Sequence, residues 1–315
     1  MTFTTRFAPS PTGPLHLGHA YSAMLAHDMA HAAQGQFLLR IEDIDQSRAR
    51  PHWEEQIFDD LSWLGLDWPI PVLRQSDNMK SYTQALDKMW QNGLLYQCDC
   101  TRRDIEEAAS APQEGVPTHG LDGLIYPGTC RVRHPRSGAR PEGKALRLDI
   151  QAALAQFTVP VAYIETGENA GHINATGMTE TSGDIVLARR DMGTSYHLSV
   201  VVDDAAQSIT HVVRGADLAE ATRIHVLLQG LLGLPTPIYH HHRLIRDDAG
   251  KRLAKRDDAR AIAKYRAEGA TPADMRSMVG LAPFSDLKNP RGEAKPGGRQ
   301  PPNWSVPASD GLDQN

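Results

Sequence analysis

Two histidines near the amino terminus, His16 and His19, have the residue type and the spacing to bind an anion. They follow a segment rich in proline and glycine, and apolar residues recur at helical spacing after them. They therefore fall at a predicted helix start, where unpaired N–H groups and the helix dipole favour a phosphate. Gly18 would let a flat ligand approach the backbone. Two surface histidines without a role are one alternative; a metal pair is weaker, because no carboxylate or further histidine follows at ligand spacing.

Two further sets of charged side chains stand where buried strands are predicted to end. Glu42 and Asp43 follow the apolar stretch 36–41, and Arg214 ends the apolar stretch 209–214. Acids at such a position can bind an ammonium group, a ribose or a metal, or can simply cap a helix. An arginine there can bind a carboxylate through two hydrogen bonds, or can cap a surface turn.

The three cysteines lie in one window that is rich in loop-forming residues. Cys98 and Cys100 open the window and Cys130 closes it. Three thiols so placed suit a zinc site with reduced cysteines better than a disulfide framework, and three unrelated free cysteines are the alternative. Chemistry leaves a fourth ligand open, with histidine normally favoured, among His119, Asp122, Tyr126 and His134.

The elements that must position these residues alternate between strands and helices. A strand over 3–8, a helix from Leu17 and a strand over 36–41 form a strand–helix–strand unit, which predicts a parallel α/β sheet with ligands at the carboxyl ends of its strands. Further strands are predicted over 94–97, 145–150, 157–164, 184–190 and 209–214. Further helices are predicted from Pro51 and over 79–92, 218–232 and 272–279, and a loop or ribbon over 165–182.

Length, composition and net charge limit the class of protein to which the chain can belong. The chain has 315 residues, of which 40% are hydrophobic and 23% charged, as in ordinary globular proteins of one or two domains. No apolar run is long enough for a membrane span and no signal pattern opens the chain, so we expect a cytoplasmic monomer with no membrane partner. A net charge of −5 argues against a basic coat for nonspecific nucleic-acid binding. The basic run 131–147 is either a solvated face or a local phosphate-binding patch.

The run Arg6-Phe-Ala-Pro-Ser-Pro-Thr-Gly-Pro-Leu-His-Leu-Gly-His19 resembles the first signature of class I aminoacyl-tRNA synthetases, in the form of the glutamyl branch. The resemblance covers residues 1 to about 260 and implies a Rossmann-like domain with a parallel sheet that uses ATP with Mg²⁺. It implies that the ATP site contains His16, Gly18 and His19, the two histidines being catalytic. It also implies a glutamate site formed by Arg6, Phe7, Ala8, Pro9, Ser10, Glu42, Tyr196 and Arg214.

Within that implied glutamate site three side chains have separate roles. By the resemblance, Glu42 contacts the α-amino group of L-glutamate, Tyr196 lines the pocket and Arg214 selects the γ-carboxylate.

The stretch Gly250-Lys-Arg-Leu-Ala-Lys-Arg256 resembles the second class I signature, a lysine-rich loop. Lys255 occupies the position of the second lysine, and the resemblance implies that it binds ATP and stabilises the triphosphate charge as pyrophosphate leaves. Two positions depart from the family pattern: Arg252 stands where the first lysine is expected, and Ala254 replaces a serine. Arginine preserves the charge, whereas alanine loses a hydroxyl, so activation could be slower.

The pattern Cys98-x-Cys100 followed by Tyr126-x3-Cys130 is similar to that of short glutamyl-tRNA synthetase paralogues, which transfer glutamate to queuosine in tRNA(Asp). The resemblance implies a structural Zn²⁺ held by Cys98, Cys100, Tyr126 and Cys130, and tRNA(Asp) carrying queuosine as the partner. A glutamyl-tRNA synthetase that acylates the tRNA 3′ end and a non-catalytic tRNA-binding paralogue are the alternatives.

The domain organisation follows from the same comparison. We expect residues 1–97 and 183–283 to form the two halves of the catalytic domain, residues 98–182 an inserted α/β subdomain bearing the zinc, and residues 284–315 a disordered tail. About 30 residues are too few for the anticodon-binding domain of full-length relatives, so none is expected.

Overall fold

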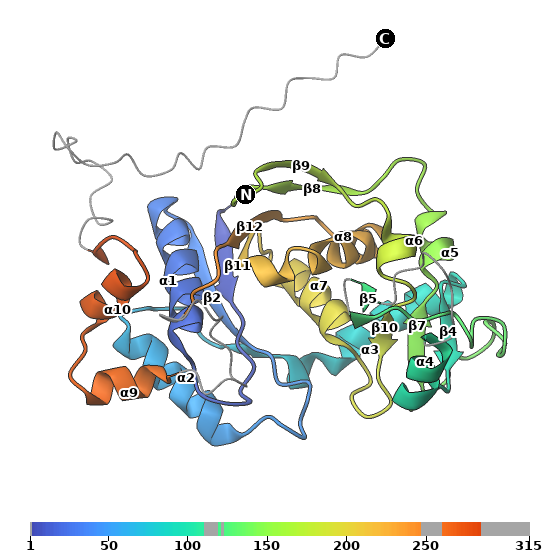
Figure 1. Cartoon of the computed structure of the whole chain (residues 1–315), viewed down its shortest axis with the longest axis horizontal. Helices are drawn as coiled ribbons and strands as arrows, with labels where there is room; N and C mark the ends of the chain where they lie inside the picture. Colours follow the sequence, from blue (N-terminus) through green and yellow to red (C-terminus); the bar gives the residue numbers. More distant parts are fainter. Residues whose placement is uncertain (1, 110–118, 121–122, 247–259, 285–315) are drawn as a thin grey trace, which may run out of the picture.

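A computed structural model describes residues 2–109, 119–120, 123–246 and 260–284, and Figure 1 shows its arrangement. The strands within these residues are β1 (Thr4–Phe7), β2 (Gln36–Ile41), β3 (Leu73–Arg74), β4 (Leu95–Cys98), β5 (His119–Gly120), β6 (Gly123–Leu124), β7 (Ala145–Leu148), β8 (Ala162–Glu165), β9 (Gly171–Asn174), β10 (Val186–Ala188), β11 (His211–Gly215) and β12 (Ile238–His242).

Helices connect and cover these strands. The α-helices are α1 (Leu17–Ala32), α2 (Pro51–Trp63), α3 (Met79–Gln91), α4 (Arg102–Ala109), α5 (Ile150–Leu154), α6 (Met178–Thr181), α7 (Tyr196–Ala206), α8 (Ala221–Leu232), α9 (Ile262–Ala267) and α10 (Pro272–Met278), and two 3₁₀-helices cover Gln75–Asn78 and Ala216–Leu218. No helix among the described residues is both long and apolar enough to cross a membrane.

The centre of the fold is a parallel arrangement of strands. β1, β2 and β3 pair in parallel, and so do β11, β12 and β8, with β9 added antiparallel at the edge. β11 continues the first group beside β1, because the backbone N–H of Thr4 donates to Thr210 Oγ1 (2.8 Å) and the N–H of Thr210 donates to the Thr4 carbonyl (3.0 Å). The predicted strand–helix–strand unit and parallel sheet are confirmed.

A second sheet is antiparallel, in the order β10–β7–β4. It lies at the opposite end of the molecule from α2, α9 and α10 (Figure 1), and a large apolar core packs between it and α3, α7 and α8. In this sheet β7, which lies in the expected insertion, pairs with β4 and β10 of the expected catalytic halves. β8 also lies in the expected insertion, and it pairs with β12 of the second catalytic half. The division at residues 98 and 183 stays a prediction.

Several elements differ from the prediction, and a local polar contact explains one of them. The strand predicted over 145–150 ends at Leu148, because the Asp149 side chain accepts the N–H of Ala152 (3.1 Å) and starts α5. The strand predicted over 157–164 begins only at Ala162, and the stretch 165–182 contains β9 and α6. β12 was not predicted, because its three consecutive histidines do not give the apolar pattern expected of a buried strand. The strand is nevertheless buried between β11 and β8.

One helix that supports the parallel sheet contains a buried acid. Asp60 of α2 is fully buried, whereas its neighbour Asp59 is exposed and pairs with Arg266 (2.7 Å). Burial, with the adjacent Asp59 carboxylate, raises the pKa of Asp60 to about 6, and the Arg266 guanidinium offsets only part of this. Because the folded pKa exceeds the unfolded value of 3.8, the free energy of unfolding falls as the pH rises between these values.

We therefore expect Asp60→Asn to stabilise the protein by about 1–3 kcal/mol above roughly pH 7, where the wild-type carboxylate is charged. Near pH 4 the buried acid is protonated, and the difference between variant and wild type should largely disappear. Denaturant unfolding at several pH values measures this. Asp59→Asn is the matched control and should change stability by less than about 1 kcal/mol. An Asp60→Asn effect that is independent of pH would contradict the interpretation.

Candidate functional site

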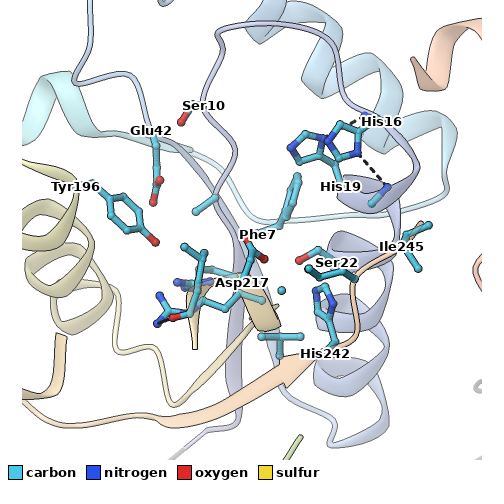
Figure 2. A pocket seen from close by; sticks show the side chains of 18 residues that line it. Phe7, Ser10, His16, His19, Ser22, Glu42, Tyr196, Asp217, His242 and Ile245 are labelled. Atoms are coloured by element: carbon cyan, nitrogen blue, oxygen red, sulfur yellow. Dashed lines mark hydrogen bonds between the residues drawn. The ribbon is translucent and has the colours of Figure 1, made fainter. Parts of the chain in front are cut away.

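The carboxyl ends of the parallel strands border a cavity of about 440 Å³. Ten of the residues predicted to bind ATP or glutamate line it: Arg6, Phe7, Ala8, Ser10, His16, Gly18, His19, Glu42, Tyr196 and Arg214. Pro9 lines an adjoining cavity of about 440 Å³, which shares part of the same wall. Lys255, with Arg252 and Ala254, lies outside the described residues. In Figure 2 the two histidines lie on one side of the first cavity, and Glu42 and Tyr196 on the other.

The two histidines cap α1 at its first turn. His16 is the N-cap residue in an extended conformation, its Nδ1 accepts the N–H of Gly18 (3.1 Å), and the N–H of His16 donates to Nδ1 of His19 (3.1 Å). The two rings lie 3.8 Å apart between centroids. Because both Nδ1 atoms accept hydrogen bonds, each neutral ring carries its proton on Nε2. A Cβ at position 18 would approach the His16 ring to 3.0 Å, so glycine permits this packing.

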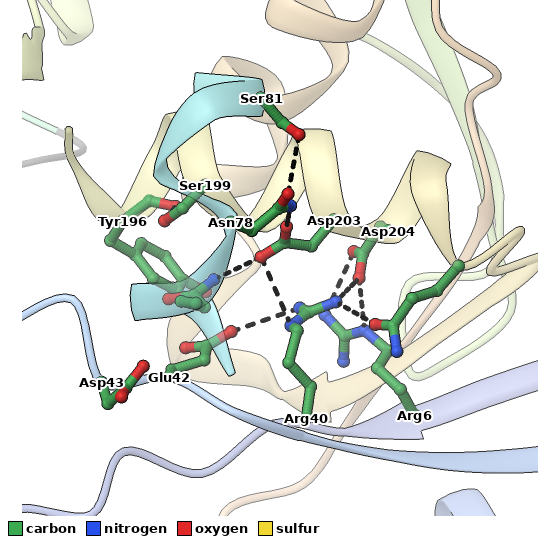
Figure 3. A network of polar contacts seen from close by, with 12 residues as sticks. Arg6, Arg40, Glu42, Asp43, Asn78, Ser81, Tyr196, Ser199, Asp203 and Asp204 are labelled. Carbon is green, nitrogen blue, oxygen red and sulfur yellow. Dashed lines mark hydrogen bonds and ion pairs between the residues drawn. The ribbon is translucent and has the colours of Figure 1, made fainter. Parts of the chain in front are cut away.

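The floor of the cavity rests on a buried ion network, shown in Figure 3. Arg6 Nε donates to Asp204 Oδ1 (3.1 Å), and Arg40 donates from Nη1 to the same oxygen (2.7 Å) and from Nη2 to Glu42 Oε1 (3.2 Å). Burial alone would raise the pKa of Asp204, but Arg6 and Arg40 outweigh it and lower that pKa. Burial raises the pKa of Glu42 more than the two arginines lower it, so an added cation beside Glu42 would favour its charged form.

A second acid, Asp203, is fully buried and neutral donors surround it. Its carboxylate accepts hydrogen bonds from Gln75 Nε2 (2.8 Å), Asn78 Nδ2 (2.6 Å) and Tyr82 Oη (2.8 Å), and Arg40 Nε lies 3.9 Å away. Sequence reasoning did not identify these residues or Arg40. The available signal in the sequence was polar side chains within apolar stretches. Arg40 lies in the stretch 36–41, and Asp203 and Asp204 directly follow three valines.

Tyr196 begins α7 and forms a wall between the two cavities, since it lines both. Burial raises the pKa of its hydroxyl, so that the group is protonated and can donate a hydrogen bond. Three polar residues that were not predicted also line the first cavity: Ser22, Asp217 and His242.

Arg214 is buried at the end of β11, with most of its N–H groups already engaged. Nε donates to His241 Nε2 (3.2 Å), Nη1 to His225 Nδ1 (3.1 Å), and Nη2 to Thr222 Oγ1 (2.7 Å) and the Leu218 carbonyl (3.3 Å). Its partners are all uncharged acceptors, so the guanidinium keeps its positive charge at the cavity. One N–H of Nη1 has no partner among the described residues, which leaves it for a ligand.

The cysteines form a compact cluster, as predicted. The three Sγ atoms lie within 4.8 Å of one another, and the hydroxyl of Tyr126 lies 3.5 Å from Cys98 Sγ and 3.4 Å from Cys100 Sγ. Burial raises the pKa of Tyr126 and of Cys100, the latter to about 11. Burial alone would also raise the pKa of Cys130, but hydrogen bonds from Tyr126 and nearby groups outweigh this effect and lower the pKa to about 7.

Among the described residues, the other fourth-ligand candidate, His134, does not join this cluster. His134 Nε2 lies 2.5 Å from an oxygen of Asp99 instead. The side chain of His119 and residue Asp122 lie outside the described part of the chain. The donor set of three thiols with one phenol oxygen is compact enough to hold a tetrahedral zinc ion.

Comparison with known proteins agrees with this geometry. Residues 2–290 match the sequence model of the family described as tRNA synthetases class I (E and Q), catalytic domain. A glutamyl-Q tRNA(Asp) synthetase of Rhodobacter capsulatus is 63% identical over 281 residues, which cover 88% of this chain and 99% of that protein. One from Symbiobacterium thermophilum is 40% identical over 90% of this chain and 86% of that protein.

A solved glutamate tRNA ligase from Elizabethkingia meningosepticum is 26% identical with a TM-score of 0.68, over 88% of this chain. The chain spans about three fifths of that ligase, since the match covers 60% of it. The sequence match, the parallel sheet and the cavity at its carboxyl edge lead to one conclusion: the chain belongs to the class I tRNA synthetases (E and Q), and among them to the glutamyl-Q tRNA(Asp) synthetase family.

Proposed function

We propose that this chain activates L-glutamate with ATP, forming glutamyl adenylate and pyrophosphate, and then transfers glutamate from the adenylate to queuosine in tRNA(Asp), with AMP as the leaving group. The observation that carries the proposal is the placement of Arg214, Glu42 and the start of α1 around one cavity. These groups complement a side-chain carboxylate, an ammonium group and a phosphate. The names of the relatives, which align over nearly the whole chain, supply the tRNA acceptor.

Glutamate recognition rests on two opposite charges. Arg214 would bind the γ-carboxylate through its remaining Nη1 N–H, while its neutral partners leave its charge uncompensated. Glu42 would accept the α-ammonium group, whose positive charge would lower the pKa that burial raises. Tyr196 would close the pocket between them and donate from its hydroxyl.

ATP would lie at the start of α1, on Gly18 and the two histidines. The α-carboxylate of glutamate attacks the α-phosphorus, the bond to the bridging oxygen breaks, and pyrophosphate leaves with the electron pair. Glutamate itself is the nucleophile, so the protein contributes positioning and charge stabilisation. His16 and His19 would donate from Nε2 to phosphate oxygens. Mg²⁺ bound with ATP would reduce the charge of the triphosphate.

Zinc would have a structural role. Cys98, Cys100, Cys130 and Tyr126 fit a closed site with four protein ligands, and none of the four lines either of the two cavities. We also propose that the protein acts in the cytoplasm, where it would meet a tRNA partner.

The direct test is exchange of labelled pyrophosphate into ATP, followed by location of labelled glutamate on tRNA. We expect exchange that depends on glutamate, and label on queuosine of tRNA(Asp) that resists removal of the 3′ adenosine. tRNA(Asp) without queuosine is the control and should accept no label. Label on the 3′ adenosine or on tRNA(Glu) would instead indicate a glutamate–tRNA ligase, and absence of exchange would indicate a non-catalytic tRNA binder.

Replacement of Lys255 tests the charge stabilisation that the second signature implies. Lys255→Ala should lower the rate of exchange by about 100-fold or more, because a cation that stabilises transition-state charge is worth about 3 kcal/mol or more. Lys251→Ala, four positions earlier in the same stretch, is the matched control and should keep most of the activity. Near-normal exchange in Lys255→Ala would remove this lysine from the mechanism.

Metal analysis tests the zinc proposal. We expect one zinc per chain, lost in Cys130→Ser together with several kcal/mol of stability, because binding energy at a structural zinc site contributes to folding. Tyr126→Phe should bind zinc more weakly, since it lacks the oxygen. His134→Ala is the control and should retain zinc. A stable wild-type protein purified without metal would rule out a structural zinc.

A further inference from the structure

A row of buried side chains runs behind Arg214 and ends on a carboxylate. Glu165 of β8 contacts Nδ1 of His241 on β12, and His241 Nε2 accepts from Arg214 Nε (3.2 Å). On its other side Arg214 donates to His225 Nδ1 (3.1 Å), and His225 Nε2 lies 3.1 Å from Nδ1 of His197. All five residues are buried, and only Arg214 lines the described wall of the cavity.

The protons of this row have one consistent arrangement. Arginine has donors only, so His241 Nε2 and His225 Nδ1 must both present lone pairs to Arg214. A neutral imidazole has one N–H, and that of His241 therefore lies on Nδ1, facing Glu165. Burial lowers the pKa of His225 well below its ordinary value, and the Arg214 charge lowers it further, which keeps this ring neutral.

Glu165 is held so that its two oxygens are not equivalent. Its Oε1 accepts two backbone N–H groups, from His241 (2.9 Å) and Gly167 (2.7 Å), while Oε2 faces the His241 ring. Burial alone would raise the pKa of Glu165, but hydrogen bonds from His241 and Gly167 outweigh it and lower that pKa, so the group is a carboxylate. A Cβ at Gly167 would lie 2.2 Å from the His241 carbonyl, so only glycine allows the loop to pass this closely.

We propose that Glu165 is a positioning residue for glutamate recognition: it fixes the proton of His241 on Nδ1, and the lone pair on Nε2 then aims Arg214 at the cavity. This inference rests on the proposed function, because it assigns Arg214 to the γ-carboxylate. It adds a specificity determinant from β8, a strand that does not border the glutamate pocket.

The substitution Glu165→Gln changes this proton without changing the shape of the side chain. The amide oxygen must take the position of Oε1, since two backbone N–H groups point at it. The NH₂ group then faces His241 Nδ1 and donates to it, which moves the ring proton to Nε2. The new Nε2–H of His241 would have Thr222 Oγ1 (3.0 Å) as its acceptor, while Arg214 Nε–H (3.2 Å) would lose the lone pair that it bonds in the wild type, so the guanidinium would no longer be held at Nε.

The expected result is a KM for glutamate in pyrophosphate exchange that rises about 10- to 100-fold, the size of a lost hydrogen bond to a charged group. The KM for ATP, and kcat at saturating glutamate, should stay within about twofold of wild type. The neighbour Thr166 provides the matched control: its hydroxyl bonds the Tyr239 carbonyl (3.1 Å) and His240 Nδ1 (3.1 Å), outside the row behind Arg214. Thr166→Ala should leave the KM for glutamate unchanged.

Two outcomes are distinguishable. Wild-type protein without glutamate-dependent exchange would defeat the proposed function itself. Wild-type exchange with an unchanged KM for glutamate in a folded Glu165→Gln protein would defeat only the role of Glu165.

A spectroscopic measurement covers the case in which the variant does not fold. In wild-type protein labelled with ¹⁵N-histidine, the His241 resonances, assigned through a His241→Gln variant, should show Nδ1 protonated and Nε2 unprotonated. A proton on Nε2 would overturn the proposal whatever the variants do.

Discussion

The burial of Arg40 is the constraint on which the rest of the site depends. This side chain is fully buried within β2, and desolvation of an unpaired guanidinium would cost several kcal/mol. Asp203, Asp204 and Glu42 compensate its charge, and they come from α7 and from the end of β2. Because these ion pairs join Arg40 of β2 to two acids of α7, they hold the sheet and α7 in one relative position. The cavity is formed between the same elements, which makes its geometry a consequence of charge pairing.

Arg6 and Arg40 have charged partners, whereas Arg214 has neutral ones, and this difference has a chemical reason. Arg6 and Arg40 contact carboxylates, which compensate their charge. Arg214 donates only to neutral acceptors. In the buried row the His241 ring separates Arg214 from the carboxylate of Glu165. A carboxylate in direct contact with Arg214 would compete with the substrate carboxylate for the same N–H groups. Holding an arginine by neutral histidines orients it while preserving the charge that a ligand must use.

Much of the fold and most of the site could be predicted from the sequence, because both depend on local patterns. β2 and the starts of α2 and α3 follow directly from apolar spacing, proline and flanking turns. The cavity contains His16, Glu42 and Arg214 as expected, since His16 comes after β1, Glu42 follows β2 and Arg214 lies near the end of β11, and these strand ends meet at one edge of the sheet. What could not be predicted depends on contacts between distant segments. Glu165 and His241 are 76 positions apart, and nothing in either local sequence indicates that they meet.

The cysteine cluster illustrates the same division between local pattern and distant contact. The spacing of the cysteines indicates a metal site, but the cluster is also anchored by Arg147 of β7, which the cysteine and tyrosine pattern does not include. The Arg147 guanidinium lies 3.8 Å from the centre of the Tyr126 ring, and it donates to Cys98 Sγ (3.4 Å) and to the Asp184 carbonyl (2.7 Å). One cation thus ties the cluster to β7 and to the segment just before β10. Because these contacts join the cluster to the antiparallel sheet and not to the cavity, a metal bound there would act on stability and on the placement of that sheet, and only through them on catalysis.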